Sequence, residues 1–140
     1  MKVLILHGPN INLTGIRETR IYGIMTLEEI NARLVEQGQE LGITVICQQS
    51  NHEGALIDAL HEARKWAEGV VFNPGGYSHT SVALRDAVSA IDIPVVEVHI
   101  SNIYAREDFR HQSIISSVCK GKIVGFGWKS YLLGLKAIID

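Results

Sequence analysis

Glu97 and His99 place a carboxylate two residues from an imidazole at the end of an otherwise apolar segment. In an extended strand, residues i and i+2 project to the same side. A carboxylate beside an imidazole fixes the tautomer of the ring and raises its proton affinity, which suits a general acid. A charge buried there would be unfavourable unless it were paired. The two residues are therefore a candidate acid, although a pair that only caps the following loop would leave the same pattern.

A long polar segment bounded by Gly15 and Gly23 carries Arg17, Arg20 and Tyr22. Its length and polarity are typical of a lid that closes over a site. A free tyrosine has a pKa of about 10 and is a poor base at neutral pH, but a nearby guanidinium group favours the phenolate. The segment therefore suggests a base that is assembled on closure. A solvated loop with a surface tyrosine explains the same residues.

Two amides, a further histidine and two arginines complete the candidate set. Asn10 follows Gly-Pro and Asn73 precedes Pro-Gly-Gly, so each amide could bind a carboxylate or position a water, or could only shape a turn. His79 stands at the expected start of a helix, whose free N–H groups favour a polar or anionic ligand. Arg106 and Arg110 are four residues apart on an expected short helix and share a face. They suit hydroxyl groups or a carboxylate, unless they are ordinary surface charges.

Apolar segments alternate with helical patterns, and this alternation must position the candidates. Strands are expected over 2–7, 43–48, 70–73, 94–99 and 122–126. Helices are expected after capping boxes at Thr26–Glu29 and Ser50–Glu53, over 80–90, 107–113 and 128–139. Such alternation implies parallel strands joined by right-handed helical crossovers. We expect an α/β, flavodoxin-like three-layer sandwich with a five-stranded parallel sheet in the order 2-1-3-4-5, forming a single domain over residues 1–140.

In this topology, ligands bind outside the carboxyl ends of the strands, where the strand order reverses. The candidate residues follow the first, third and fourth expected strands, so they meet at one edge of the sheet. The turns at the other edge contain only plain residues. His7, His79 and His99 could all face this cleft, and three histidines can form a catalytic zinc set. None of them has a second ligand at short spacing, so we expect no metal.

Composition and charge exclude several classes of protein. Lys and Arg number 13 and Asp and Glu 15, a net charge of −2, which disfavours nucleic-acid and membrane-surface partners. The early apolar run 3–6 is too short for a signal peptide or for a membrane span of about 20 residues. Cys47 and Cys119 form no C-x-x-C pair, so we expect reduced thiols in a cytoplasmic protein. Glycine-rich phosphate-binding motifs are absent from the sequence.

Several motifs together resemble one known family, the type II 3-dehydroquinate dehydratases. They are HGPNINL (7–13), GIRE (15–18), YG (22–23), SNHEG (50–54), NPGGYSHTS (73–81), RDA (85–87), EVHISN (97–102), ARE (105–107) and FR (109–110). They occur in the family's order and span the chain. The resemblance implies a cofactor-free hydro-lyase that converts 3-dehydroquinate to 3-dehydroshikimate through an enolate, in the shikimate pathway or in quinate breakdown.

The resemblance also implies catalytic roles for matching residues. Tyr22 would be the lid base that removes the proton beside the ketone. Arg17 would close over the site, and Arg106 would keep Tyr22 ionised. His99 would protonate the departing hydroxyl group and would be oriented by Glu97.

A second group of matching positions surrounds the substrate in the family: Asn10, Asn73, His79, Asp86, Ile100, Ser101 and Arg110. Asn10 would hold a water against the enolate oxygen. Asn73 and the two residues after His99 would cradle the carboxylate side of the ring, while His79 and Arg110 would hold ring hydroxyl groups. Asp86 would reach the site of a neighbouring subunit, because the family forms trimers assembled into dodecamers.

Three residues depart from the usual family pattern, and two other kinds of protein would fit the same fold. Thr14 stands where leucine is usual, Thr19 where proline is usual, and Ser130 where a glycine is common. A non-catalytic binder of a small polyhydroxy acid would keep the fold and cleft but would not need the lid pair of Arg17 and Tyr22. A flavodoxin-like electron carrier would be coloured when purified.

Overall fold

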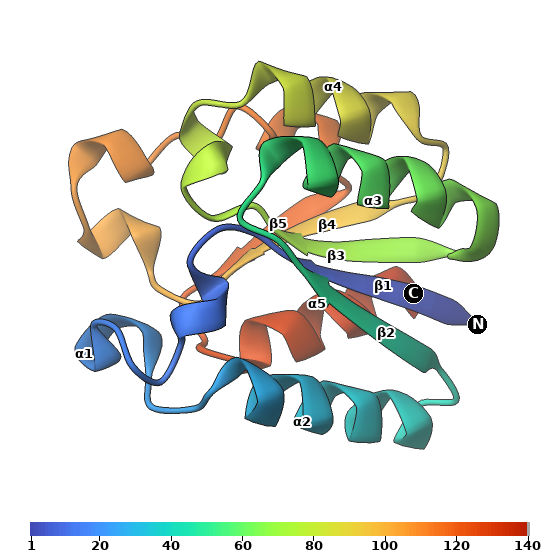
Figure 1. The fold of residues 1–140 in the computed structure, drawn as a ribbon, viewed down its shortest axis with the longest axis horizontal. Helices are drawn as coiled ribbons and strands as arrows, with labels where there is room; N and C mark the ends of the chain where they lie inside the picture. Colours follow the sequence, from blue (N-terminus) through green and yellow to red (C-terminus); the bar gives the residue numbers. More distant parts are fainter. Residues whose placement is uncertain (140) are drawn as a thin grey trace.

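Five parallel strands form one sheet in the computed structural model, which describes residues 1–139. In the order β2-β1-β3-β4-β5, the sheet contains β1 (Lys2–His7), β2 (Thr44–Gln49), β3 (Gly69–Asn73), β4 (Val95–His99) and β5 (Gly121–Val124). Helices α2 (Leu27–Glu40) and α5 (Lys129–Ile139) cover one face, and α3 (Glu53–Trp66) and α4 (Val82–Ala90) cover the other (Figure 1). The predicted flavodoxin-like sandwich and strand order are confirmed. Asp140, the last residue of the predicted domain, lies outside the described residues.

Side-chain alternation along the strands divides the apolar core into two halves. On β1, Leu4 and Leu6 pack with residues of α3 and α4, whereas Val3 and Ile5 pack with residues of α2 and α5. This period of two is the geometry of any extended strand. Strands β3 and β4 are buried along their whole length, as parallel strands covered on both faces must be. The same alternation therefore decides which layer receives each polar side chain at the strand ends.

The N-terminus of α2 is specified locally. Thr26 has extended backbone angles, and its Oγ1 accepts a hydrogen bond from Glu29 N over 3.2 Å. The same hydroxyl donates to Glu29 Oε1 over 3.1 Å. The predicted start of this helix is confirmed, because both partners lie within one turn of each other.

Two predicted helix starts are wrong, and Ser81 makes a side-chain hydrogen bond at each of these two helices. Ser50 and Glu53 form no capping box: α3 begins at Glu53, and the carboxylate of Glu53 accepts a hydrogen bond from Ser81 Oγ over 2.5 Å. Helix α4 begins at Val82 because Ser81 Oγ also accepts from Leu84 N over 2.9 Å. His79 therefore lies in the preceding 3-10 turn, η2 (Gly75–His79), and not at a helix start.

The short helix expected over 107–113 is a single 3-10 turn, η4 (Asp108–Arg110). Arg110 N donates to Glu107 O and His111 N donates to Asp108 O, which closes the turn with bonds three residues long. The lid segment also contains a short helix that the sequence reading did not predict, α1 (Thr19–Tyr22). It begins after Glu18, which has a left-handed backbone, and ends at Gly23, whose φ is +85°.

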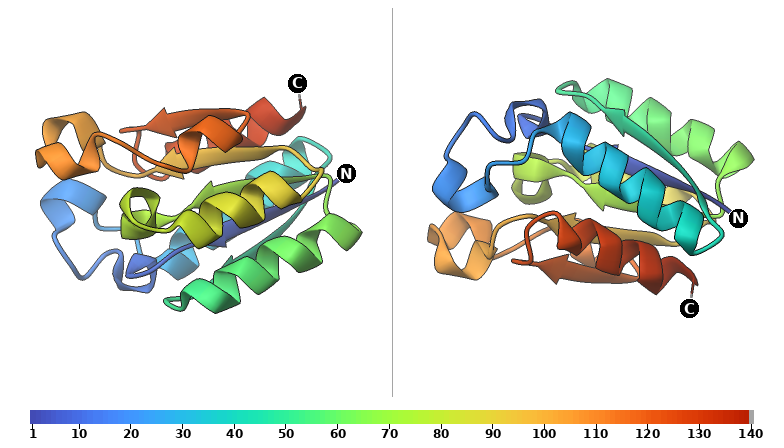
Figure 2. Two further views of the ribbon diagram at one scale, coloured as in Figure 1. Left: turned by 90° about the horizontal axis from the view of Figure 1, so that it is seen from above. Right: turned by 90° about the horizontal axis from the view of Figure 1, so that it is seen from below.

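The lid and the turns after β4 lie side by side at one end of the molecule, away from the two termini (Figure 2). This is the end at which β1, β3 and β4 finish. It is therefore the end at which the fold predicts a ligand site. No helix within residues 1–139 is long and apolar enough to span a membrane.

A close approach of β1 and β3 shapes the floor of this end. Gly8 N donates to Asn73 O over 2.7 Å. A Cβ atom at Gly8 would stand 2.8 Å from Asn73 O and from the backbone of Pro74, closer than such atoms can lie. Only glycine allows the two strand ends to meet in this way.

We expect Gly8→Ala to lower the free energy of unfolding by about 1–3 kcal/mol, because the added methyl group must push two backbone segments apart. Urea unfolding followed by circular dichroism measures the change. Gly54→Ala is the matched control, because a Cβ atom there would meet nothing within 4 Å and alanine favours a helix. Equal stability of wild type and Gly8→Ala would contradict the close-approach argument.

Candidate active site

A cavity of about 190 Å³ lies at the carboxyl ends of β1, β3 and β4. The strand order reverses between β1 and β3, so the cavity occupies the position that the topology favours for a ligand. The predicted site residues that line it are Asn10, Arg17, Tyr22, Asn73, His79, His99, Ile100, Ser101, Arg106 and Arg110. The rest of the lining comes from Pro9, Ile11, Gly75, Gly76 and Ile103.

Four residues singled out in the sequence are not part of the cavity lining. Glu97 is fully buried behind His99. Asp86 lies on α4 with an exposed carboxylate, 3.7 Å from Arg85 Nη1. Arg20 lines a separate, neighbouring cavity beneath the lid. His7 is also fully buried, because strand alternation sends it toward α2 and α5 with Val3 and Ile5; the expectation that three histidines could share one cleft is wrong.

Glu97 and His99 are in direct contact, as their spacing predicts. His99 Nε2 donates to Glu97 Oε2 over 2.5 Å, and Glu97 Oε1 accepts from Ser116 Oγ over 2.6 Å and from Ser113 Oγ over 3.1 Å. Burial opposes the charge of Glu97, but the hydrogen bond and charge of His99 and then the two serine hydroxyls outweigh it. The pKa of Glu97 therefore lies below its ordinary value. An ionised Glu97 keeps the proton on Nε2 and leaves Nδ1 as the free ring nitrogen.

The two serines that hold Glu97 were missed in the sequence. Ser116 begins the 3-10 turn η5 (Ser116–Val118), and Ser113 lies three residues before it. Both residues are well separated in sequence from Glu97 of β4. Their spacing has no distinctive pattern. The only signal was chemical: a buried carboxylate needs more donors than one imidazole can supply.

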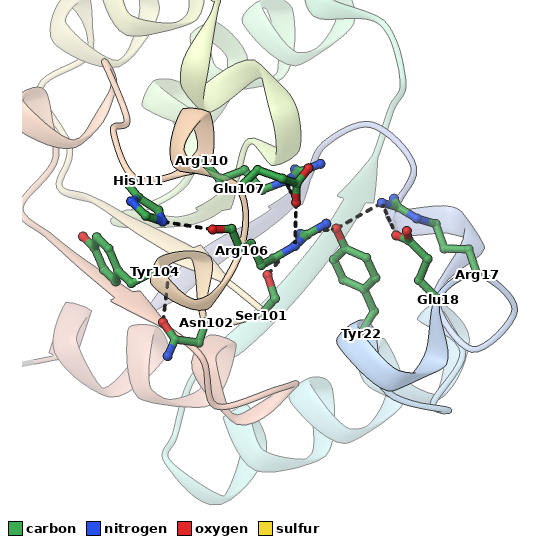
Figure 3. A network of polar contacts seen from close by, with 10 residues as sticks. All are labelled: Arg17, Glu18, Tyr22, Ser101, Asn102, Tyr104, Arg106, Glu107, Arg110 and His111. Atoms are coloured by element: carbon green, nitrogen blue, oxygen red, sulfur yellow. Dashed lines mark hydrogen bonds and ion pairs between the residues drawn. The ribbon is translucent and has the colours of Figure 1, made fainter.

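The hydroxyl group of Tyr22 lies between two guanidinium groups (Figure 3). Arg106 Nη1 donates to Tyr22 Oη over 2.6 Å, and Arg17 Nη2 donates to it over 3.0 Å. The guanidinium carbons of Arg17 and Arg106 also lie 4.3 and 5.1 Å from the centre of the tyrosine ring. Arginine has no acceptor, so the phenolic oxygen accepts in both contacts. Tyr22 therefore contacts Arg17 of its own segment and Arg106 from the turns after β4.

Asn10 is held in a left-handed backbone conformation with φ +69°, which asparagine tolerates better than most residues. Its N–H group donates to Asn51 Oδ1 over 3.0 Å, and Gln49 Nε2 donates to the same oxygen over 3.2 Å. Tyr77 Oη donates to the carbonyl oxygen of Asn51 over 2.9 Å. Asn51 therefore orients Asn10. In the sequence, only the SNHEG motif points to Asn51, and its residue types alone indicate no chemical role.

His79 and the two cysteines have well-defined surroundings. His79 Nδ1 donates to the carbonyl oxygen of Gln112 over 2.7 Å, which leaves Nε2 as its free nitrogen.

Burial raises the pKa of Cys47 and of Cys119 to about 12, and the charge of Glu97 adds to the effect at Cys119. Both thiols therefore stay protonated at neutral pH. Between residues 1 and 139, no three His, Cys, Asp or Glu side chains gather closely enough to hold a metal ion.

The residues that depart from the family pattern make local contacts. The buried Thr14 donates from Oγ1 to Ile11 O over 2.8 Å. The buried Ser130 accepts from Phe126 N over 3.1 Å, in the turn before α5. Thr19 is exposed at the start of α1. Neither of these two side-chain hydrogen bonds involves Tyr22 or Arg17.

Fold and site together define a class of protein. It is a doubly wound α/β protein whose ligand cavity places a phenol between two guanidinium groups and an imidazole against a buried carboxylate. Such groups transfer protons, and the cavity lies at the fold's usual ligand position.

Comparison with known proteins identifies the family. The dehydroquinase class II family pattern matches residues 1–139. A 3-dehydroquinate dehydratase of Pelotomaculum thermopropionicum is 58% identical over 137 residues, which cover 98% of this chain and 95% of the relative. The type II dehydroquinase structure from Butyrivibrio crossotus has a TM-score of 0.98 at 45% identity, covering 100% of this chain and 98% of that one. The one from Propionibacterium acnes has a TM-score of 0.94 at 41% identity, covering 99% and 97%.

The chain therefore belongs to the dehydroquinase class II family. This membership confirms the family and the enzyme class that the motifs predicted.

The buried His7 predicts a specific pH dependence of stability. Burial lowers its pKa to about 4, although a hydrogen bond to Asn31 acts in the opposite direction. An unfolded chain binds a proton at this histidine below about pH 6.5, whereas the folded chain does so only below about pH 4. The stability that the neutral ring contributes is therefore complete above pH 6.5 and is lost progressively as the pH falls toward 4.

We expect the free energy of unfolding of the wild type to fall by about 3 kcal/mol more than that of His7→Gln between pH 7 and pH 4. Urea unfolding at intervals of half a pH unit measures both curves. Between pH 7 and 8 the two proteins should show the same slope, which is the internal control. Parallel curves below pH 6.5 would show that His7 is not held neutral in the folded chain.

Proposed function

We propose that this chain dehydrates 3-dehydroquinate to 3-dehydroshikimate through an enolate, with Tyr22 as the base, His99 as the acid and no cofactor. The named relatives support the overall reaction. One observation carries the mechanism: the Tyr22 oxygen, held by two guanidinium groups, lines the same cavity as the carboxylate-held His99. A β-hydroxy ketone loses water when a base removes the proton beside the ketone and an acid protonates the departing hydroxyl group.

The base step begins at the Tyr22 oxygen. A phenolate between Arg17 and Arg106 is stabilised by two charged donors in a partly enclosed site, where such interactions exceed those in water. The phenolate takes the proton from the carbon beside the ketone, and the electron pair of that C–H bond forms the enolate. A water held by Asn10 stabilises the enolate oxygen. Electrostatic stabilisation of this kind is commonly the largest contribution to catalysis.

The acid step uses His99. Glu97 holds the Nε2–H group, so the ring acts as the imidazolium, which also carries a proton on Nδ1, and Nδ1 is the nitrogen that delivers its proton. The enolate electrons form the new carbon–carbon double bond as the C–O bond breaks, and the departing hydroxyl takes the proton from Nδ1 and leaves as water. The ionised, buried Glu97 holds the ring in place throughout and stabilises its charged form.

The remaining lining residues suit the polar parts of the substrate. Asn73, Ile100 and Ser101 follow β3 and β4 and would hold the carboxylate side of the ring. His79, with Nε2 free, and Arg110 would hold ring hydroxyl groups. The support for these roles is their convergence on one cavity from separate loops.

The proposal extends to the assembly and the cell. The exposed carboxylate of Asp86 on α4 would complete the site of a neighbouring subunit, in trimers that assemble into dodecamers. We also place the enzyme in the cytoplasm, serving either aromatic biosynthesis or quinate breakdown. Analytical ultracentrifugation of the purified chain tests the assembly directly.

The reaction is tested by adding purified chain to 3-dehydroquinate and following the ultraviolet absorbance of the conjugated enone. We expect His99→Ala to lower kcat by about 100-fold or more, the usual effect of losing a general acid, while substrate still binds. His61→Ala is the matched control, because His61 is exposed on α3, outside the cavity. Nearly intact turnover in His99→Ala would exclude the acid role. Substrate binding by wild type without any turnover would favour a non-catalytic binder.

A double-mutant cycle tests the lid pair. We expect Tyr22→Phe to leave only a small residual kcat yet keep the affinity for 3-dehydroquinate, measured by calorimetry, within a few-fold, because the hydroxyl acts mainly in the transition state. Arg17→Ala alone should also lower kcat strongly. In the Tyr22→Phe background, however, Arg17→Ala should cost little more, since the two groups act as one unit. Rate losses that multiply would show that the two side chains do not form a catalytic pair.

A further inference from the structure

A chain of hydrogen bonds runs behind the cavity wall and ends at Asn73. His7 Nε2 lies 2.8 Å from Asn31 Oδ1 on α2, and His7 Nδ1 lies 2.9 Å from Tyr131 Oη on α5. Asn73 Nδ2 donates to the same Tyr131 oxygen over 2.9 Å. His7 and Tyr131 are completely buried, and of these four residues only Asn73 lines the cavity. The mechanism above uses neither His7 nor Tyr131.

The sheet register explains why one tyrosine reaches both residues. His7 of β1 and Asn73 of β3 are direct register partners, and both project toward the layer of α2 and α5. Tyr131 lies in the first turn of α5 and places its hydroxyl between them. Its ring meets the His7 ring edge-on, with 4.9 Å between the ring centres.

Each group in this chain has one available role. The Asn31 oxygen accepts, so the His7 proton lies on Nε2 and Nδ1 must accept. The pKa of His7, lowered by burial, agrees with a neutral ring. The Tyr131 hydroxyl therefore donates to Nδ1, and burial raises its pKa above the ordinary value, so it keeps that proton. The Tyr131 oxygen is then left to accept from Asn73.

The direction of these hydrogen bonds fixes the orientation of the Asn73 amide. Asn73 Oδ1 accepts from Gly75 N over 3.0 Å, and one Nδ2 hydrogen is taken by Tyr131. A flipped amide would lose both bonds. The second Nδ2 hydrogen is the polar group that remains for the cavity. Asn73 thus offers a donor to a ligand, and a donor suits an anionic group.

We propose that Tyr131 and His7 are positioning residues that set the Asn73 amide as a hydrogen-bond donor toward the carboxylate of the substrate. This inference rests on the proposed function, because that function places the substrate carboxylate at Asn73. Asn31 serves as the outer end of the chain. A purely structural role for Tyr131 would affect stability and leave the affinity for substrate unchanged.

Tyr131→Phe tests the inference because it removes one oxygen atom and keeps the ring. We expect KM for 3-dehydroquinate to rise about tenfold with kcat changed less than twofold, since a bond to a charged group is weakened equally in the ground and transition states. Tyr104→Phe is the matched control: Tyr104 is exposed in the 3-10 turn η3 (Ile103–Ala105), outside the cavity, and should keep the wild-type KM. An unchanged KM in Tyr131→Phe would overturn the inference.

A cycle with Asn73 separates positioning from general damage. In the Asn73→Ala background, Tyr131→Phe should raise KM no further. His7→Gln supplies one acceptor and one donor and should stay close to the wild-type KM, whereas His7→Leu should resemble Tyr131→Phe. A second, independent rise of KM in the Asn73→Ala background would show that Tyr131 acts by another route.

A measurement without substrate distinguishes this inference from the proposed function. The Asn73 side-chain amide should exchange slowly with solvent in wild type and faster in Tyr131→Phe, as followed by NMR of the 15N-labelled chain. A wild-type chain that shows this protection but lacks dehydratase activity would refute the proposed function and leave the hydrogen-bond chain standing. Equal exchange rates of the Asn73 amide in the two proteins would refute the proposed chain of hydrogen bonds.

Discussion

The alternation of side chains along parallel strands is the constraint on which this site depends. Because successive residues face opposite layers, β4 sends Glu97 and His99 toward the side of α3 and α4, whereas β1 and β3 send His7 and Asn73 toward α2 and α5. The same sheet edge therefore carries two separate buried polar systems. One contains a charged carboxylate and the other is neutral. A shift of one residue in any of these strands would send the polar side chains of that strand to the opposite layer.

The cavity lies between groups of different charge. On the lid side, two guanidinium groups converge on one phenolic oxygen (Figure 3). On the sheet side, a buried carboxylate holds an imidazole. The buried charge of Glu97 is stabilised by several partners, because this carboxylate accepts from one ring nitrogen and two hydroxyls. Partners placed in advance need not reorganise when charge moves during a reaction, which is how an enclosed site lowers a barrier.

Features set by nearby residues could be predicted from the sequence, and features set by distant contacts could not. The strands, their order and the Thr26 cap of α2 follow from local patterns and a topological rule. The start of α3 was misjudged because Glu53 bonds to Ser81, which is far along the chain. The contacts of Ser113 and Ser116 with Glu97, and of Asn51 with Asn10, also join residues distant in the sequence, so they could not be predicted. The motifs indicated which residues line the cavity. The hydrogen bonds from the two serines to Glu97 and the burial of His7 could not be predicted without the register of the sheet.

The central claim is that Tyr22 removes a proton from the substrate to give an enolate, and that His99 then protonates the departing hydroxyl group. It is tested most directly by incubating His99→Ala with 3-dehydroquinate in deuterium oxide and analysing the recovered substrate by mass spectrometry. Our account predicts one deuterium at the carbon beside the ketone, because the proton is removed and replaced while the hydroxyl cannot leave, and no deuterium when Tyr22→Phe is added. Recovered substrate without deuterium, or uptake that persists in the double variant, would contradict it.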